Sequence, residues 1–437
     1  MSKRKTQIVV VGGGAGGLEL VRKLGSRYGR KDHDIILVDC NLTHVWKPLL
    51  HEVAAGSLDA NMDEVGYGGH AVRWGYRFFH GALEKIDRDK QQIITSPLLD
   101  DKGEEIIGRH VIRYDYLVLA FGGISNDFGV PGVREHSHFL EHRGHADGFR
   151  QRLLNACLRA NHAHQTGKGD ADVRICIIGA GATGVELAAE LYNAASSLRT
   201  YGLEVFDEDK LKVTLLEAGP RILPQLDEDL AGTAHHELER LGVEVQPSTQ
   251  VTAVHADHVE TKSGDRIEAD LIVWAAGIKG SDGVAQMSDL ELNRLDQFIV
   301  RPTLQTTKDD RIFALGDCAS CLLPGDEKPI PPRAQSAHQM ASLVFDNLVR
   351  AQQSKPLKDF VYRDRGSLVS LSRFSALGSL MGNLVGGRMA IEGRLARWAY
   401  QSLYRLHLLA IHGYVRGIML IIIGRVNQIV RPKFKLH

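Results

Sequence analysis

The sequence predicts an α/β protein with two parallel-sheet domains, the second inserted within the first. The stretch IVVVGGGAGGLEL at 8–20 is a short apolar run that passes through glycines into helical spacing, and ICIIGAGATGVEL at 175–187 repeats it. A continuous apolar run that ends in glycine is typical of a strand buried on both faces of a parallel sheet. A soft prior of about 150 residues per domain gives this chain two or three domains.

The remaining elements follow the same alternation. The first copy continues as a helix over 16–24 and a strand over 35–38. The second copy has a strand over 173–178, a helix over 182–192 and a strand over 211–216, and further apolar runs lie at 116–119, 271–275 and 312–315. Strands interleaved with helices indicate α/β architecture throughout. We therefore divide the chain into a first domain in two parts, a second domain and a C-terminal region: 1–140 with 297–375, then 141–296, then 376–437.

Each glycine stretch is a G-x-G-x-x-G fingerprint followed by an acid at the end of the next strand. In this Rossmann-like pattern the first glycine permits a tight turn, the second lets the backbone approach a pyrophosphate, and the third lets helix and strand pack closely. The acid binds a ribose hydroxyl. The two sets are Gly12, Gly14 and Gly17 with Asp39, and Gly179, Gly181 and Gly184 with Glu217. Glu217 lies 33 residues past Gly184, beyond the usual ~20, and we attribute the excess to a polar loop at 197–210.

Two dinucleotide sites in one chain predict electron transfer between two dinucleotides. Here the sequence resembles the two-dinucleotide-binding flavoprotein reductases, in which the N-terminal loop binds FAD and the internal loop binds NAD(P)H. The stretch TLQTTKDDRIFALGDCA at 303–319 is a further signature of that family. The resemblance implies that Gly316, Asp317 and Lys47 contact FAD and that Gly277 contacts NADH. Glu217 favours NADH over NADPH, because a carboxylate there repels a 2′-phosphate.

Four features narrow the resemblance to the type II NADH:quinone oxidoreductases of gram-negative bacteria: a loop, a glutamine motif, Glu186 in the stretch GATGVEL, and the C-terminal region described below. The loop at 42–59 lacks the cysteine pair of the disulfide reductases, and PPRAQSAHQMA at 331–341 matches an AQxAxQ pattern. Gln335 and Gln339 are four residues apart and share a helix face. The resemblance implies that these two glutamines border the flavin and the quinone, and that Glu186 lies near the nicotinamide and flavin. We interpret Glu186, Gln335 and Gln339 as the catalytic residues.

Each of these residues also has a purely structural interpretation. The two glutamines could form an exposed helix face, and Glu186 could be a first-turn acid favoured by the helix dipole. We interpret His338 as a packed or solvent-facing histidine, and Cys318 and Cys321 as small buried thiols rather than a redox pair. The histidines at 44, 51, 70 and 80 show no H-x3-H or Cys-His spacing typical of a metal site, and we expect no metal.

The C-terminal region carries an unusual charge. Residues 388–437 hold nine basic residues and one acid in a chain of formal net charge zero. Polar residues from Arg394 to Arg416 recur at steps typical of one helix face, with tyrosines and a tryptophan among apolar residues. The best apolar window, 406–426, is interrupted by His407, His412, Arg416 and Arg425, whereas a spanning helix needs about 20 predominantly apolar residues. We expect an amphipathic helix in the interface of an anionic bilayer; the alternative is a core helix or a homodimer contact.

These inferences predict a peripheral membrane flavoenzyme on the cytoplasmic face of the bacterial inner membrane. It passes two electrons from NADH through FAD to a membrane quinone without pumping protons. The N-terminal apolar run is too short for a secretory signal, and the neutral overall charge gives no indication of a nucleic-acid partner. Two alternatives stay open: a sulfide:quinone oxidoreductase, which needs redox cysteines, and a catalytically idle NADH-sensing flavoprotein scaffold.

Overall fold

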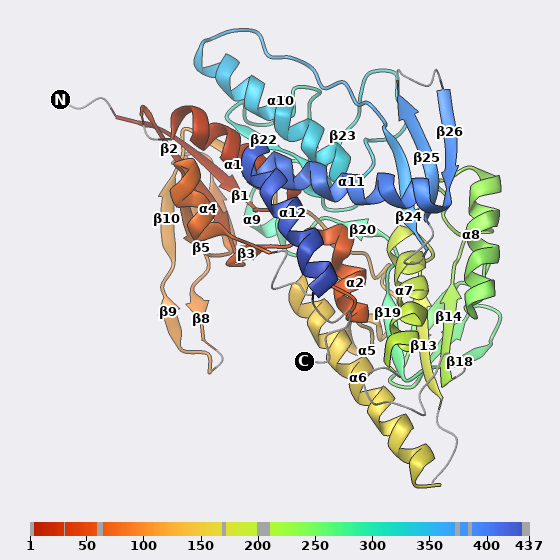
Figure 1. The fold of residues 1–437 in the computed structure, drawn as a ribbon. Coiled ribbons are helices and arrows are strands. Elements are labelled where there is room, and N and C mark those ends of the chain that lie inside the picture. Colours follow the sequence, from red (N-terminus) through yellow and green to blue (C-terminus); the bar gives the residue numbers. More distant parts are fainter. Residues whose placement is uncertain are drawn as a thin grey trace. The chain divides into compact units, whose positions relative to one another are not determined.

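Two units, each built on its own parallel sheet, make up the computed structural model of this chain (Figure 1). The structure describes residues 4–29, 31–58, 64–100, 102–167, 172–198, 210–371, 376–382 and 387–430. The first unit comprises 1–45, 64–124 and 278–363, and the second comprises 46–63, 125–277 and 364–437.

The first unit centres on a five-stranded sheet with β1 in its middle. The strand order is β22-β11-β1-β2-β5, and each neighbouring pair is parallel. Apolar residues fill β1 because both of its faces are covered, and Ile8, Val9 and Val10 have no exposed surface. The strands are β1 (Thr6–Val11), β2 (His33–Asp39), β5 (Arg77–His80), β11 (Tyr116–Leu119) and β22 (Ile312–Ala314).

Helices and small sheets complete the first unit. Helix α1 (Ala15–Tyr28) packs against α10 (Ala334–Gln352). The shorter helices are α4 (Tyr67–Trp74), α9 (Val284–Met287) and the 3-10 turn η4 (Gly316–Cys318). The remaining strands are β3 (Thr43–His44), β4 (Val65–Gly66), β6 (Leu83–Asp87), β7 (Gln92–Thr95), β8 (Leu98–Leu99), β9 (Glu105–Ile107), β10 (His110–Arg113), β20 (Ile278–Lys279), β21 (Phe298–Val300) and β23 (Ala319–Cys321).

The second unit repeats the parallel plan with β13 in the centre of its sheet. The order is β15-β14-β13-β19, and β13 pairs in parallel with both β14 and β19. The strands are β13 (Val173–Ile178), β14 (Leu211–Leu216), β15 (Glu244–Gln246) and β19 (Leu271–Trp274). Its helices are η1 (Lys47–Leu49), α2 (Leu50–Ala55), α5 (Val133–His136), α6 (Arg143–Gln165), α7 (Ala182–Leu198) and α8 (Glu228–Leu241). The strand β12 (Ile124–Ser125) lies where the chain passes from the first unit to the second.

Two antiparallel sheets also belong to the second unit. One has the order β16-β17-β18, and the other β24-β25-β26. Their strands are β16 (Val251–Val254), β17 (His258–Thr261), β18 (Arg266–Glu268), β24 (Gly366–Ser370), β25 (Ala376–Gly382) and β26 (Gly387–Glu392). The compact units therefore do not follow the four predicted segments, since 46–63 and everything from 364 onward fall with the unit of the second glycine loop.

The C-terminal region forms two helices where the sequence pattern predicts one. Helix α11 (Gly393–His412) ends at Gly413, whose φ of +74° breaks the helix, and α12 (Tyr414–Val430) follows. The prediction that polar residues from Arg394 to Arg416 share one helix face was wrong at its end. His412 lies on α11 and Arg416 lies on α12. Glycine at 417 lets α12 approach closely, since a Cβ there would lie 3.0 Å from the Cα of Leu409.

The two helices differ in how they are buried. On α11, His407, Leu408 and Ile411 are buried, and the His407 ring stacks on Trp46 at a centroid distance of 4.0 Å. The core-helix interpretation therefore holds for this helix. In α12, by contrast, large apolar side chains are exposed: Val415, Ile418, Met419, Leu420, Ile422, Ile423 and Val426. Among the residues that the structure describes, we find no helix with both the length and the apolar character needed to cross a bilayer.

Candidate active site

The first glycine loop joins β1 to α1. Its three glycines have the local geometry that the sequence predicts, namely a tight turn, an open backbone and close packing of helix against strand. Gly12 has a φ of +102°, and a Cβ there would lie 2.4 Å from the Cα of Phe121. A Cβ on Gly17 would lie 1.9 Å from the carbonyl oxygen of Gly12, so helix and strand pack closely only with glycine there. Gly14 is open, since a Cβ would find only the Ala120 oxygen, at 3.9 Å. The middle glycine therefore leaves room for a ligand to approach the backbone.

The second loop, between β13 and α7, repeats this geometry residue by residue. Gly179 has a φ of +103°, and a Cβ on Gly184 would lie 2.0 Å from the oxygen of Gly179. A Cβ on Gly181 would meet nothing within 4 Å. Both loops thus present open backbone at the start of a helix, where free N–H groups favour phosphate.

The two predicted acids occupy equivalent positions. Asp39 Oδ2 accepts a hydrogen bond from the amide of Gly13 at 2.6 Å, and Glu217 Oε2 accepts one from the amide of Ala180 at 2.9 Å. In each case the donor is the residue after the first glycine of the loop. A carboxylate has about four lone-pair positions, so each acid retains acceptor capacity beside its loop. The polar stretch invoked to explain the long spacing before Glu217 falls largely on 199–209, outside the described residues.

The predicted Gly316–Asp317 pair lies in η4, beside the start of α10 in the first unit. A Cβ on Gly316 would lie 3.5 Å from that of Ala337, and one on Gly16 would lie 2.9 Å from the Ala337 oxygen. Gln297 Nε2 donates a hydrogen bond to the backbone oxygen of Asp317 at 2.9 Å. The first turns of α1 and α10 therefore lie close together, which concentrates helix N-termini around the first glycine loop.

The two predicted catalytic glutamines lie half-buried on α10, but Gln339 has a structural role. Its Nε2 donates to the Arg363 carbonyl at 2.9 Å, and its Oε1 accepts from the Arg363 amide at 3.0 Å. His338 contacts the carboxylate of the buried Glu19, which also pairs with Lys23 at 2.6 Å. Burial opposes the charge on Glu19, but His338 and Lys23 outweigh it and lower the pKa of its carboxyl. His338 is thus a packed histidine, as the sequence indicated.

The structure places Lys47 and Gly277 in the second unit. Lys47 begins the 3-10 turn η1 and is exposed. Gly277 follows β19, where a Cβ would lie 2.6 Å from the Phe128 ring, so close packing alone already favours glycine there. Their contacts with FAD and NADH stay predictions.

Glu186 is the centre of a buried polar cluster in the second unit. It lies beyond the first turn of α7, so the alternative interpretation as a first-turn acid was wrong, and it is only 6% exposed. Its Oε1 accepts a hydrogen bond from the Ser370 amide at 3.0 Å, and its Oε2 lies 3.4 Å from His51 Nδ1. The neighbouring groups come from α2, β24 and α11.

Burial controls the charges in this Glu186 cluster. It raises the pKa of Glu186 to about 8, with the charge of Glu52 adding to the effect and the Ser370 amide and Tyr400 hydroxyl opposing it. It also lowers the pKa of His51 to about 4. Near neutral pH the carboxyl therefore holds a proton and the imidazole holds none, so the 3.4 Å approach is a contact between neutral groups.

Sequence reasoning missed two members of this cluster. We had interpreted Tyr400 as an interfacial aromatic, but its hydroxyl is buried beside Glu186. The sequence pattern gives His51 no role. A signal for Tyr400 existed, because it shares a helix face with His407 and Ile411, which are buried.

The cysteines behave as predicted for small buried thiols. Cys318 and Cys321 are both buried and unbonded to each other. Burial raises the pKa of the Cys318 thiol to about 12 and that of Cys321 to about 11. Thiols in this environment are poor nucleophiles, which counts against the sulfide:quinone alternative.

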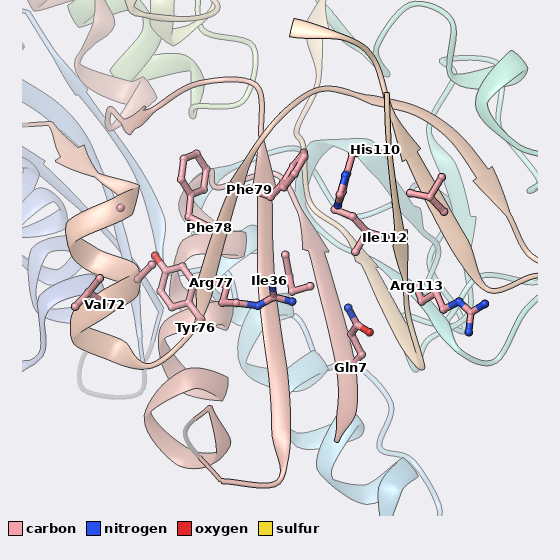
Figure 2. A pocket seen from close by; sticks show the side chains of 13 residues that line it. Gln7, Ile36, Val72, Tyr76, Arg77, Phe78, Phe79, His110, Ile112 and Arg113 are labelled. Carbon is pink, nitrogen blue, oxygen red and sulfur yellow. The ribbon is translucent and has the colours of Figure 1, made fainter. Parts of the chain in front are cut away.

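One cavity of the first unit lies apart from every predicted site residue. It has a volume of about 560 Å³ and is lined by β2, β5, β10 and α4, with Phe78, Phe79 and Ile112 on its walls (Figure 2). No residue of either glycine loop lines it. We therefore assign it no part in the chemistry.

Comparison with known proteins identifies the family. Residues 6–341 match the pyridine nucleotide-disulphide oxidoreductase family. The chain is 42% identical to the type II NADH:quinone oxidoreductase of Haemophilus influenzae, with 98% of this chain and 99% of that protein covered. The chain belongs to the type II NADH:quinone oxidoreductase family. The Staphylococcus aureus member is 31% identical, with 89% of this chain and 93% of that protein covered.

Solved structures agree on the fold of this type II family member. NDH2 of Plasmodium falciparum, solved in complex with NADH, has a TM-score of 0.80 at 16% identity, covering 99% of this chain and all of that one. The sulfide:quinone oxidoreductase of Aquifex aeolicus has a TM-score of 0.70 at 20% identity, covering 97% and 95%.

We expect the raised pKa of Glu186 to appear in the pH dependence of stability. From pH 4.5 to 8 the native Glu186 binds more protons than the unfolded chain, so its contribution falls as pH rises. Because the pKa of His51 is lowered, its contribution to stability rises with pH between pH 4 and 6.5. Of these two groups, only Glu186 changes its contribution between pH 6.5 and 8. Across this window the free energy of unfolding of the parent should fall, relative to Glu186→Gln, by up to about 2 kcal/mol.

Urea unfolding of parent and Glu186→Gln, both with FAD bound, would measure this difference at several pH values. Glutamine retains an acceptor for the Ser370 amide and carries no charge at any pH. A constant difference between pH 6.5 and 8 would show that Glu186 does not titrate in this range.

Proposed function

We propose that this protein oxidises NADH and reduces a membrane quinone, passing two electrons through FAD without pumping protons. The observation that carries the proposal is the pair of matched nucleotide loops in a chain 42% identical to a type II NADH:quinone oxidoreductase over almost its whole length. The overall reaction converts NADH, a proton and quinone into NAD⁺ and quinol. Bound FAD supplies the two-electron chemistry that links these half-reactions.

The residues of each unit fit one nucleotide. The open backbone at Gly14, the acid Asp39 and the Gly316–Asp317 turn suit FAD in the first unit. The FAD contact of Lys47, a residue of the second unit, rests on the family resemblance alone. The open backbone at Gly181, with Glu217 and Gly277, suits NADH in the second unit. Each loop combines an unobstructed backbone, a helix N-terminus and an adjacent carboxylate, the three features that a dinucleotide requires.

In this proposal Glu186 lies near the nicotinamide and flavin, as the resemblance implies, and holds a proton near neutral pH. Quinone takes up two protons with its two electrons, and a donor is effective when its pKa lies near the working pH. A carboxyl with a pKa of about 8 meets that condition. His51 and Tyr400 are positioning residues, because they keep the carboxyl buried and oriented.

The two glutamines have different parts in the same proposal. Gln335 borders the flavin and the quinone from the first turn of α10. Gln339 acts indirectly, because its amide fixes the backbone of Arg363 through two hydrogen bonds. Their separation by one helical turn places both on the same face of α10.

We also propose that α12 and the exposed edge of α11 rest on the cytoplasmic face of an anionic bilayer. Ile418 is 51% exposed and Ile422 is 57% exposed, and Leu403 and Leu406 of α11 are also exposed. Arg416 adds a positive charge to this surface. Quinones are lipid-soluble, so an enzyme that reduces them gains access to its substrate by lying on the membrane.

The cofactor prediction is a strong preference for NADH over NADPH. Glu217 should repel the 2′-phosphate of NADPH. In Glu217→Gln, the ratio of kcat/KM for NADH to kcat/KM for NADPH should fall by roughly tenfold, or ~1.4 kcal/mol. Steady-state assays with a short-chain quinone would measure both. Equal kcat/KM for NADH and NADPH in the parent would contradict the role of Glu217 and the proposed substrate.

For Gln335 we expect a substitution to affect one half-reaction much more than the other. In Gln335→Leu, NADH should bleach the FAD absorbance within about twofold of the parent rate, while reoxidation by quinone slows by about tenfold or more. Stopped-flow absorbance at the flavin band separates the two rates. Gln353→Leu, at the exposed C-cap residue that follows the same helix, is the control. Slow bleaching with FAD still bound would place Gln335 in the NADH half-reaction instead.

The membrane prediction concerns the apolar face of α12. Ile418→Glu with Ile422→Glu should weaken flotation with phosphatidylglycerol vesicles by about tenfold or more, because two charges replace apolar contacts with lipid. Reduction of ferricyanide by NADH should be unchanged. Leu158→Glu on α6, where leucine is 47% exposed, is the matched control. Removing all of 391–437 would be a poor test, because it would strip Tyr400 and His407 from the second unit.

Sedimentation of the same variants would identify the other occupant of this face. If parent and double variant float equally, lipid is not what α12 contacts. A parent dimer that becomes a monomer in the double variant would then assign the face to a second copy of the chain.

A further inference from the structure

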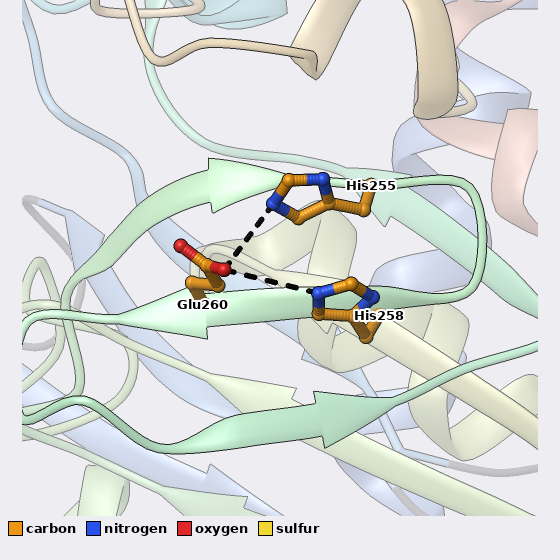
Figure 3. Close-up of side chains that lie close together, drawn as sticks. All are labelled: His255, His258 and Glu260. Carbon is orange, nitrogen blue, oxygen red and sulfur yellow. Dashed lines mark ion pairs between the residues drawn. The ribbon is translucent and has the colours of Figure 1, made fainter.

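We infer that His255, His258 and Glu260 form a binding site for a divalent transition-metal ion on the β16–β17 hairpin. The amide of His255 donates to the His258 carbonyl at 2.8 Å, which closes a two-residue turn. Residues that face each other across such a turn project to the same side of the hairpin. Glu260 lies two residues beyond His258 on the same strand and therefore shares that side. Figure 3 shows the three side chains gathered there.

The distances between the three side chains suit one small cation. Glu260 Oε1 lies 3.5 Å from His255 Nε2 and 3.9 Å from His258 Nε2, and the candidate ligand atoms all lie within 4.8 Å of one another. A tetrahedral ion with bonds of about 2.0 Å holds its ligands about 3.3 Å apart. The two imidazole rings are stacked, with 4.3 Å between their centroids and 10° between their planes, so binding requires the rings to turn until both nitrogen lone pairs face the ion.

A hydrogen bond with Asp257 orients the His258 ring for metal binding. His258 Nδ1 lies 2.6 Å from Asp257 Oδ1, and Arg266 lies 3.4 Å from the other oxygen of Asp257. A carboxylate that accepts from one ring nitrogen leaves the other nitrogen with its lone pair available, as in many carboxylate–histidine–zinc sites.

His255 provides a second, independent observation. Its Nε2 is shielded from solvent and makes no hydrogen bond, although Glu260 is near. Buried polar atoms normally have a partner. A metal ion bound between His255, His258 and Glu260 would satisfy this nitrogen and balance the carboxylate.

The hairpin gives the site a rigid support. Val254 and Val259 point into the core of the second unit, where they are 2% and 0% exposed. Because side chains alternate along a strand, this packing holds His258 and Glu260 on the opposite face. Ligands whose backbone is fixed by packing lose less freedom when they bind an ion.

The donor set indicates the class of ion. Two imidazoles and one carboxylate suit Zn²⁺ and its neighbours Ni²⁺ and Cu²⁺, whereas Mg²⁺ and Ca²⁺ prefer oxygen ligands. Three protein ligands leave a fourth position for water. The expectation of no metal rested on the histidines at 44, 51, 70 and 80 and did not consider the H-x2-H-x-E pattern at 255–260.

Equilibrium dialysis of the FAD-bound protein against ZnCl₂, after chelator treatment, tests the site. We expect the parent to bind one more equivalent of zinc than His255→Ala with His258→Ala, or to bind that equivalent at least about tenfold more tightly. Glu260→Gln should weaken it with little change in shape. His236→Ala, an exposed histidine of α8, should bind like the parent.

A second measurement guards against misfolding. Zinc should raise the thermal unfolding temperature of the parent and of His236→Ala, and leave that of Glu260→Gln less changed, at equal FAD content. MgCl₂ should produce no such shift. Equal zinc stoichiometry, affinity and stabilisation in the parent and all three variants would overturn the inference.

Discussion

Each unit depends on one hydrogen bond, in which a backbone amide of the glycine loop donates to a carboxylate. In both units the acid that ends the second strand accepts from the amide after the first glycine, so strand, loop and helix are joined at one point. This bond holds the open middle glycine and the helix N-terminus in one place. We propose that the two nucleotides bind there, because backbone amides and helix ends carry the positive potential that phosphates require.

The glycine loops were predictable because their chemistry is local. A tight turn, an open backbone and a close helix–strand contact each require glycine at a fixed position, and the apolar runs before them identify buried parallel strands. The same holds for Cys318 and Cys321, whose neighbours in sequence already place them beside a buried strand. Short-range patterns of this kind determine the geometry almost alone.

The Glu186 cluster was not predictable for the opposite reason. Its members lie on α2, α7, β24 and α11, and nothing near Glu186 in the sequence indicates that Ser370 or Tyr400 will bury it. The error over the C-terminal helix has a similar origin. Charges and aromatics at helical steps indicate an amphipathic helix. Only packing reveals that His407 of α11 stacks on Trp46 while α12 leaves apolar side chains exposed.

The origin of the Glu186 cluster in four distant stretches has a consequence for synthesis on the ribosome. His51 and Glu186 emerge early, Ser370 much later, and Tyr400 only when nearly all of the chain has been translated. A nascent chain that already holds both glycine loops therefore has Glu186 in contact with water, ionised and without its final neighbours. The surroundings that raise the pKa of this carboxyl are therefore complete only near the end of translation.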